Sequence, residues 1–290
     1  MKISSNRFVF RALFMVNVIM LLVAIPSHAQ GMGGGRQAVP GATSTDVQQT
    51  ELHELTDVQR QPGVKIDPKE QAAYDAFFHV NSELLDKKIQ LGNAFLAKYP
   101  TSIFAEAVDA GLVSAYYEKQ DWTNFYATAD KALALKPDDV DVLTTVGWVI
   151  PHVYNPHDDN AQEQLNKAET CEKHAIAVLN AMPKPAGLSD KQFAASKAQK
   201  AIQAHSALGL VYFRREDYSN SALELQQSMV NNPSADQTDL YVLGIDLQNL
   251  NKFGEAADAF GRCAQTAGNL QDRCRQSADE AKRQAAQPKQ

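Results

Sequence analysis

The chain has 290 residues, 44% of them hydrophobic, and its 28 lysines and arginines against 34 aspartates and glutamates give a net charge of −6. An acidic chain does not hold nucleic acid through the phosphate backbone, because that mode of binding needs a basic surface. The length fits one elongated domain or two small globular ones.

Residues 1–29 predict a signal peptide. Three basic residues make the start positive, and residues 12–25 form an apolar run in which Asn17 is the one polar residue. Ser27-His28-Ala29 approximates a small-x-small cleavage site. A run of this length is shorter than the roughly 20 residues of a membrane-spanning helix, which favours cleavage. We therefore expect an exported chain, periplasmic or secreted. The alternative is an uncleaved anchor in the inner membrane, and this segment is the one predicted membrane contact.

Residues 30–66 predict a disordered linker. Four glycines lie between positions 31 and 35, and the segment has few large apolar residues to bury. The glycine run lacks the Lys-Ser/Thr that follows in a phosphate loop, so it indicates no nucleotide site. Residues 284–290 predict a disordered tail. Cleavage of the signal peptide removes three positive charges and gives the mature chain a net charge of −9.

Helical periodicity begins at Pro68, which suits the first turn of a helix. A first helix is predicted to Leu85, with an apolar face that consists of Ala72, Phe77, Val80 and Leu84. A second helix is predicted over 86–98, and Tyr99-Pro100 ends it.

A pair of amphipathic helices then recurs with a period near 34 residues. Leu208-Gly209 recurs as Leu243-Gly244, and a proline, Pro233, separates these two copies. Two earlier copies are centred on Val113 and Gly147. The separation of Gly147 from Gly209 is 62 residues, which predicts 28 extra residues, 12 of them between the two helices of that copy. The extra residues predict loops at 151–161 and 182–190, helices at 162–181 and 191–215, and a polar capping helix follows at 269–283.

These four copies resemble the tetratricopeptide repeat (TPR) family over residues 68–265. The resemblance implies an all-α fold, an α-solenoid of stacked antiparallel helix pairs (a TPR superhelix), which we place over 67–283. Its close-packing positions between helices are Val113, Gly147, Gly209, Gly244 and Ala256. The small residue usual at the start of the second helix is replaced by Phe125, Cys171 and Ser221 in the first three copies.

In this family the first helix of each pair lines a concave face, so the resemblance also implies a partner-binding groove. Helical spacing places ten residues on that face: Ser114, Tyr117, Thr144, Trp148, Ser206, Leu210, Phe213, Tyr241, Ile245 and Gln248. Four of them are aromatic, more than the packing between repeats demands. The alternative is that some of them pack against neighbouring helices.

No sequence signature of catalysis or nucleotide binding is present. His152, His157, Asp158 and Asp159 lie close together in one loop, but their spacing fits no standard metal site, so exposed loop residues are the better interpretation. We predict no catalytic residue, no metal site and no cofactor.

Two of the three cysteines are predicted to form a disulfide, since an exported chain can keep one. Cys263 and Cys274 lie on either side of a turn at Ala267-Gly268 that two antiparallel helices would share. Cys171 is predicted to be a buried, reduced packing residue.

The sequence thus predicts an exported TPR scaffold or adaptor that binds a protein or peptide in its concave groove, in the cell envelope, and is not an enzyme. The first alternative is a structural assembly subunit that acts by self-association or through its convex face. The second is a metal-binding or enzymatic protein.

Overall fold

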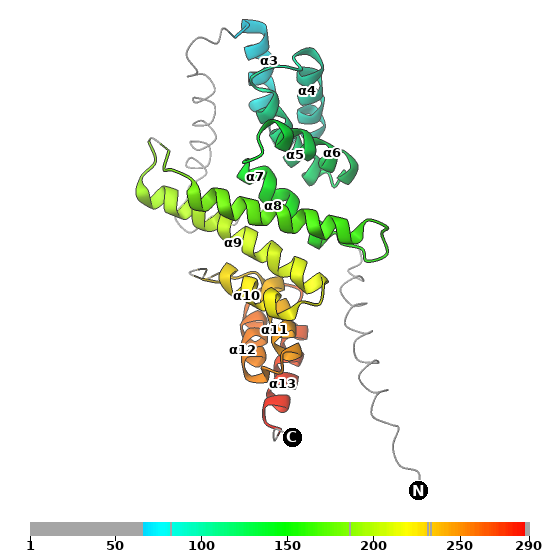
Figure 1. Cartoon of the computed structure of the whole chain (residues 1–290), viewed down its shortest axis with the longest axis vertical. Helices are drawn as coiled ribbons and strands as arrows, with labels where there is room; N and C mark the ends of the chain where they lie inside the picture. The colour runs from blue at the N-terminus through cyan, green and yellow to red at the C-terminus, as the bar shows by residue number, and fades with distance from the viewer. Residues whose placement is uncertain (1–65, 82, 186, 231, 233, 288–290) are drawn as a thin grey trace. The chain divides into compact units, whose positions relative to one another are not determined.

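The computed structural model describes residues 66–81, 83–185, 187–230, 232 and 234–287 (Figure 1). The predicted signal peptide, almost the whole predicted linker and the last three residues lie outside this part of the chain. Every regular element of the described residues is a helix: α3 (Pro68–Phe78), α4 (Leu85–Lys98), α5 (Ala105–Glu118), α6 (Trp122–Leu135), α7 (Val140–His152), α8 (Ala161–Ala181), α9 (Asp190–Arg214), α10 (Tyr218–Ser228), α11 (Gln237–Asn249), α12 (Phe253–Gln265) and α13 (Gln271–Ala285).

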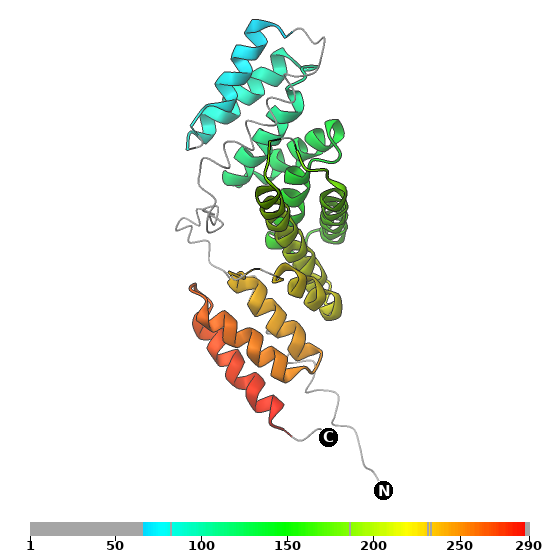
Figure 2. The same ribbon diagram turned by 90° about the vertical axis from the view of Figure 1, so that its left-hand side faces the viewer.

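Each helix packs against the next one along the chain, as α11, α12 and α13 do in Figure 2. In addition, each odd-numbered helix from α3 to α9 contacts the next odd-numbered helix. The first helices of successive pairs therefore form one continuous layer, which the second helices cover. The predicted fold, an all-α stack of helix pairs, is confirmed.

The ends of several helices differ from those predicted. α3 stops at Phe78 instead of Leu85, and Leu84 is 55% exposed, so the buried residues of this helix are Tyr74 and Phe77. α7 continues through Pro151 to His152 before the loop begins. Pro151 has no N–H to donate to the carbonyl of Gly147, so one hydrogen bond of the last turn is missing and the helix ends one residue later. The N-terminus of α9 has a capping box in which Ser189 and Gln192 bond each other's backbone N–H groups.

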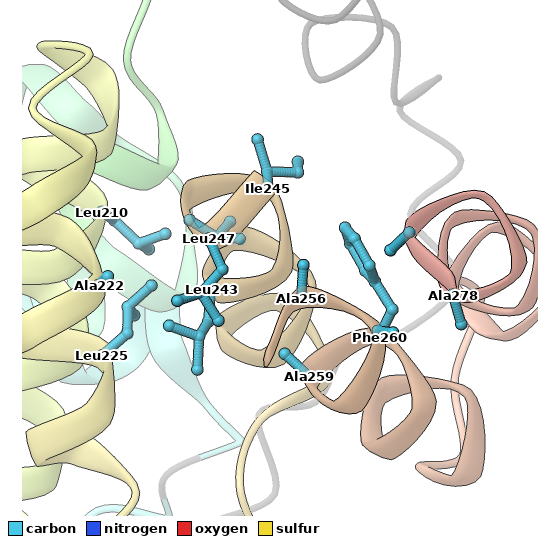
Figure 3. Close-up of a cluster of buried hydrophobic side chains, with 13 residues drawn as sticks. Leu210, Ala222, Leu225, Leu243, Ile245, Leu247, Ala256, Ala259, Phe260 and Ala278 are labelled. Atoms are coloured by element: carbon cyan, nitrogen blue, oxygen red, sulfur yellow. The ribbon is translucent and has the colours of Figure 1, made fainter. Parts of the chain in front are cut away.

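Three glycines let the helices of a pair approach closely. A Cβ atom at Gly147, Gly209 or Gly244 would lie within 3 Å of a side chain on the following helix. The side chains met are those of Glu172, Leu225 and Phe260 respectively. Leu225 and Phe260 are fully buried, and Figure 3 shows both in the apolar cluster that joins α9 to α13.

The contact between Gly147 and Glu172 corrects the predicted register of α8. Glu172 contacts Gly147 as Leu225 contacts Gly209 and as Phe260 contacts Gly244. However, Glu172 lies 25 residues after its glycine, whereas Leu225 and Phe260 each lie 16 residues after theirs. Of the twelve extra residues predicted between the two helices of this copy, nine therefore precede Glu172. The other three lie after Glu172, at the C-terminal end of α8. In this register the small residue near the start of the helix is Ala168, which is fully buried, and not Cys171. The prediction was wrong because α8 is longer than the equivalent helix of the next pair: it continues to Ala181, beyond Glu172, whereas α10 ends at Ser228, soon after Leu225.

We expect Gly244→Ala to lower the free energy of unfolding by about 2 kcal/mol, because the new methyl group would overlap the Phe260 ring. Gly261→Ala is the matched control. It adds the same methyl group to a helix where nothing lies within 4 Å, and it should stabilise by about 0.5–1 kcal/mol through helix propensity. Urea unfolding of both variants measures the difference. Equal effects of the two substitutions would contradict the close approach of α11 and α12.

Two buried carboxyl groups of α11 face serines of the preceding pair. Ser206 and Ser228 donate to Asp239 over 2.8 and 3.4 Å, and Ser221 donates to Asp246 over 2.5 Å. Burial raises the pKa of Asp239 to about 7 and the pKa of Asp246 to about 8. Both carboxyls are therefore protonated in the native protein over a pH range in which an unfolded chain would ionise them.

Stability should consequently fall as pH rises. Unfolded aspartate loses its proton near pH 3.9, whereas the native groups keep theirs to about pH 7 and 8. The unfolded state thus binds fewer protons between these limits, and each such proton costs about 1.4 kcal/mol per pH unit, so we expect a loss on the order of 6 kcal/mol between pH 5 and 8. Asp239→Asn with Asp246→Asn should flatten the dependence, and Asp258→Asn, at an exposed position, should leave it unchanged. A wild-type unfolding free energy that is constant or rises over this range would contradict the assignment.

Candidate partner-binding face

The ten residues predicted to line the groove lie on the odd-numbered helices α5, α7, α9 and α11. Four of them are buried and correct the prediction: Thr144, Ser206, Leu210 and Ile245. Leu210 and Ile245 belong to the apolar cluster between α9 and α13. The hydroxyl groups of Thr144 and Ser206 donate to Val140 O and to Asp239. Ser206, Leu210 and Ile245 thus join neighbouring helices, Thr144 bonds within α7, and none of the four forms an accessible face.

Tyr117 and Trp148 form the centre of the candidate site. Both side chains are half-buried, and they lie on successive odd-numbered helices, α5 and α7. Their ring centroids are 6.0 Å apart in a T-shaped arrangement, a favourable geometry for aromatic pairs. We call these two residues the aromatic pair. Each ring therefore fixes the position of the other, and each still exposes part of its surface to solvent.

The aromatic pair has further rings around it. Trp122 and Phe125, at the start of α6, lie 6.3 and 6.5 Å from the Tyr117 ring. His152 stacks on Trp148 with ring centroids 3.8 Å apart, and its Nδ1 lies 2.6 Å from Trp148 O. His152 was predicted to lie in an exposed loop, but it lies in the last turn of α7.

The other four predicted residues do not join the aromatic pair. Phe213 and Tyr241 pack on the cluster between α9 and α13 and contact Tyr218 and Phe260 within their own repeats. Gln248 donates to Gln284, and Ser114 is exposed on α5. All four predicted aromatic residues are half-buried, but Tyr117 and Trp148 contact each other across successive helix pairs, whereas Phe213 and Tyr241 contact rings of their own repeats.

Sequence reasoning missed two residues beside α7. Tyr154 lies in the inserted loop, and Arg214 is the last residue of α9. The Arg214 guanidinium carbon is 5.6 Å from the Tyr154 ring centre, and Arg214 Nε donates to Pro151 O over 3.1 Å. The tyrosine within the insertion was the available signal, but no spacing rule connects it to Arg214.

The rest of the inserted loop is exposed and internally hydrogen-bonded. Asn155 donates to Asp158 over 2.7 Å and accepts from the backbone N–H of His157. Among the described residues, no three His, Cys, Asp or Glu side chains are placed together as ligands of a metal ion.

A disulfide joins Cys263 at the end of α12 to Cys274 in α13, and the two Cα atoms are 5.7 Å apart. Both residues are fully buried. Cys171 is a buried free cysteine, and burial raises the pKa of its thiol to about 11. Because a nucleophilic cysteine needs its thiolate, this high pKa makes Cys171 unreactive.

The recurring helix pairs and their close-packing glycines define a TPR-like protein. Among solved structures, the chain is similar to PilF of Pseudomonas aeruginosa (TM-score 0.50, 15% identity, over 74% of this chain and 91% of that one). It also matches MamA of Desulfovibrio magneticus (0.48, 16%, 69% and 96%) and a thermophilic TPR protein of Thermus thermophilus (0.45, 14%, 73% and 98%). No protein-family model and no curated protein sequence matches the chain. Within the described residues, no helix is long and apolar enough to cross a membrane.

Proposed function

We propose that this chain is a non-catalytic scaffold that binds a segment of another protein on the face formed by its odd-numbered helices. The observation that carries the proposal is the aromatic pair, in which two half-buried rings from successive helices touch. Large rigid rings that are already ordered lose little entropy when a partner covers them, which is why aromatic residues dominate binding energy at interfaces. We expect the partner segment to be extended or helical, with apolar anchor residues.

The test is capture of a partner from envelope extracts by the purified chain. Trp148→Ala should abolish capture, and Tyr117→Ala should weaken it. Tyr241→Ala is the matched control, since Tyr241 packs within its own repeat against Phe260 and should retain capture. Capture that survives loss of both rings of the aromatic pair would rule out this face.

We also propose that residues 1–29 direct export and are removed, so that the chain works in the periplasm or outside the cell. The basic start and the short apolar run support this proposal. The mature protein should begin at Gln30 or within a few residues of it. Mass spectrometry that finds an intact Met1 in the exported protein would favour the membrane anchor instead.

Self-association is a second candidate function, and two exposed apolar side chains favour it. Leu223 in α10 is 53% exposed and Val230, just beyond the end of that helix, is 55% exposed. Exposed large apolar side chains that lie close together often mark interaction sites. If the chain assembles through them, Leu223→Glu with Val230→Glu should shift its sedimentation to the monomer, whereas Trp148→Ala should not.

A further inference from the structure

Arg214 has its guanidinium group held from two sides. Its Nε donates to Pro151 O over 3.1 Å, and its guanidinium carbon lies 5.6 Å from the centre of the Tyr154 ring, within the range of a cation–π contact. Pro151 lies in the last turn of α7, and Tyr154 lies in the loop inserted after it. The last turn of α7 and the inserted loop therefore together orient this arginine before any ligand is present.

The neighbouring arginine shows what an ordinary structural arginine does here. Arg215 forms an ion pair with Glu169 over 2.5 Å and donates to Asn166 over 2.7 Å. Arg214, by contrast, forms no ion pair with any described residue, and its two terminal amino groups donate no hydrogen bond there. A half-buried cation gives up part of its hydration, and no carboxylate of the described residues lies within ion-pair distance of Arg214. Its free amino groups are available to an anionic ligand.

Arg214 lies at the same end of α7 as the aromatic pair. Pro151, which it contacts, follows Trp148 by three residues, and His152 stacks on the Trp148 ring over 3.8 Å. A segment that places an apolar side chain on Trp148 would bring its neighbouring residues to the guanidinium group. The planar fork of arginine matches the two oxygens of a carboxylate and binds them with two parallel hydrogen bonds.

We infer that Arg214 binds a side-chain carboxylate of the partner segment, beside the apolar residue that contacts Trp148. The inference rests on the proposed function, and it specifies the partner's chemistry: an aspartate or glutamate within a few residues of a large apolar side chain. The last turn of α7 supplies the carbonyl and the inserted loop supplies the ring that hold the arginine, which assigns the insertion a role in specificity.

The experiment selects peptides from a random displayed library on the full chain. Selected sequences are then made with amidated C-termini, so that a chain end cannot supply the carboxylate. We expect enrichment of aspartate or glutamate next to an apolar residue. Changing that acid to its amide should weaken binding to the native protein at least about tenfold, and binding to Arg214→Gln less than about twofold, measured by fluorescence anisotropy.

Three further proteins separate the possible outcomes. Arg214→Lys keeps the charge without the fork, so it should lose part of the preference for acid, and it carries the test if Arg214→Gln does not fold. Trp148→Ala should lose all selected peptides. Arg215→Gln alters the neighbouring arginine and should leave the preference for acid intact.

The selected peptides could need Trp148 and yet lose the same affinity for the native and Arg214→Gln proteins when their acid is changed to the amide. That result would overturn this inference and leave the proposed function standing. Peptides that bind Trp148→Ala as well as the native protein, or a library that yields no binder, would overturn both.

Discussion

Replacing Glu172 by leucine is expected to raise the free energy of unfolding by about 3 kcal/mol at neutral pH. Glu172 is fully buried in α8, and neither carboxyl oxygen has a hydrogen-bond partner among the described residues. Burial therefore holds the pKa of this carboxyl well above its ordinary range. An unpartnered buried polar group costs several kcal/mol, and an apolar residue of similar size removes that cost. Leucine fits because Leu225 already fills the equivalent place against Gly209.

Two comparisons show which part of the cost leucine removes. Glu172→Gln abolishes ionisation but keeps an unsatisfied polar group, so it should gain less than leucine. The advantage of leucine over the wild type should grow as pH rises, because the unfolded glutamate ionises and the native one resists ionisation. Urea unfolding at pH 6 and 8 measures both effects. A leucine variant that is less stable than the wild type would mean that the Glu172 carboxyl has a stabilising partner.

Removing the disulfide is expected to destabilise α13 by about 3 kcal/mol. The bond joins cysteines 11 residues apart, and the chain-entropy model gives this value for a loop of that size. The effect should be local, because α13 is otherwise held mainly by the small buried residues Cys274, Ala278 and Ala281. Hydrogen exchange of Cys263→Ala with Cys274→Ala should therefore show faster exchange in α13 than in α7 or α9.

Cys171→Ala is the control, since it shortens a buried cysteine outside the bond and should leave exchange in α13 unchanged. Reduction of the wild-type chain should reproduce the double variant without altering any side-chain volume. If neither treatment changes exchange in α13, its packing against α12 is sufficient and the bond is dispensable.

The helix pairs could be predicted from the sequence because they depend on local periodicity. Several signals act within one or two helices: amphipathic spacing, capping residues such as Asp121, Ser189 and Asp217, and the small close-packing residue of each helix pair. The helices predicted over 86–98 and 162–181 each differ from α4 and α8 by one residue. The prediction failed at the end of α3 and in the register of α8, because no local signal in the sequence fixes where α3 ends or on which side of α8 the extra residues lie.

The sequence by itself determined the all-α repeat class, the close approach at Gly147, Gly209 and Gly244 and the opposition of Cys263 and Cys274, since each follows from spacing along one or two helices. Only the tertiary structure decided which predicted groove residues are accessible. Helical spacing assigns a residue to a face, but the neighbouring helix decides whether that face is covered. Thr144 and Ser206 are buried for that reason, whereas Trp148 is not. The meeting of Arg214 with Tyr154, 60 residues apart in the chain, likewise depends on the packing of α9 against α7.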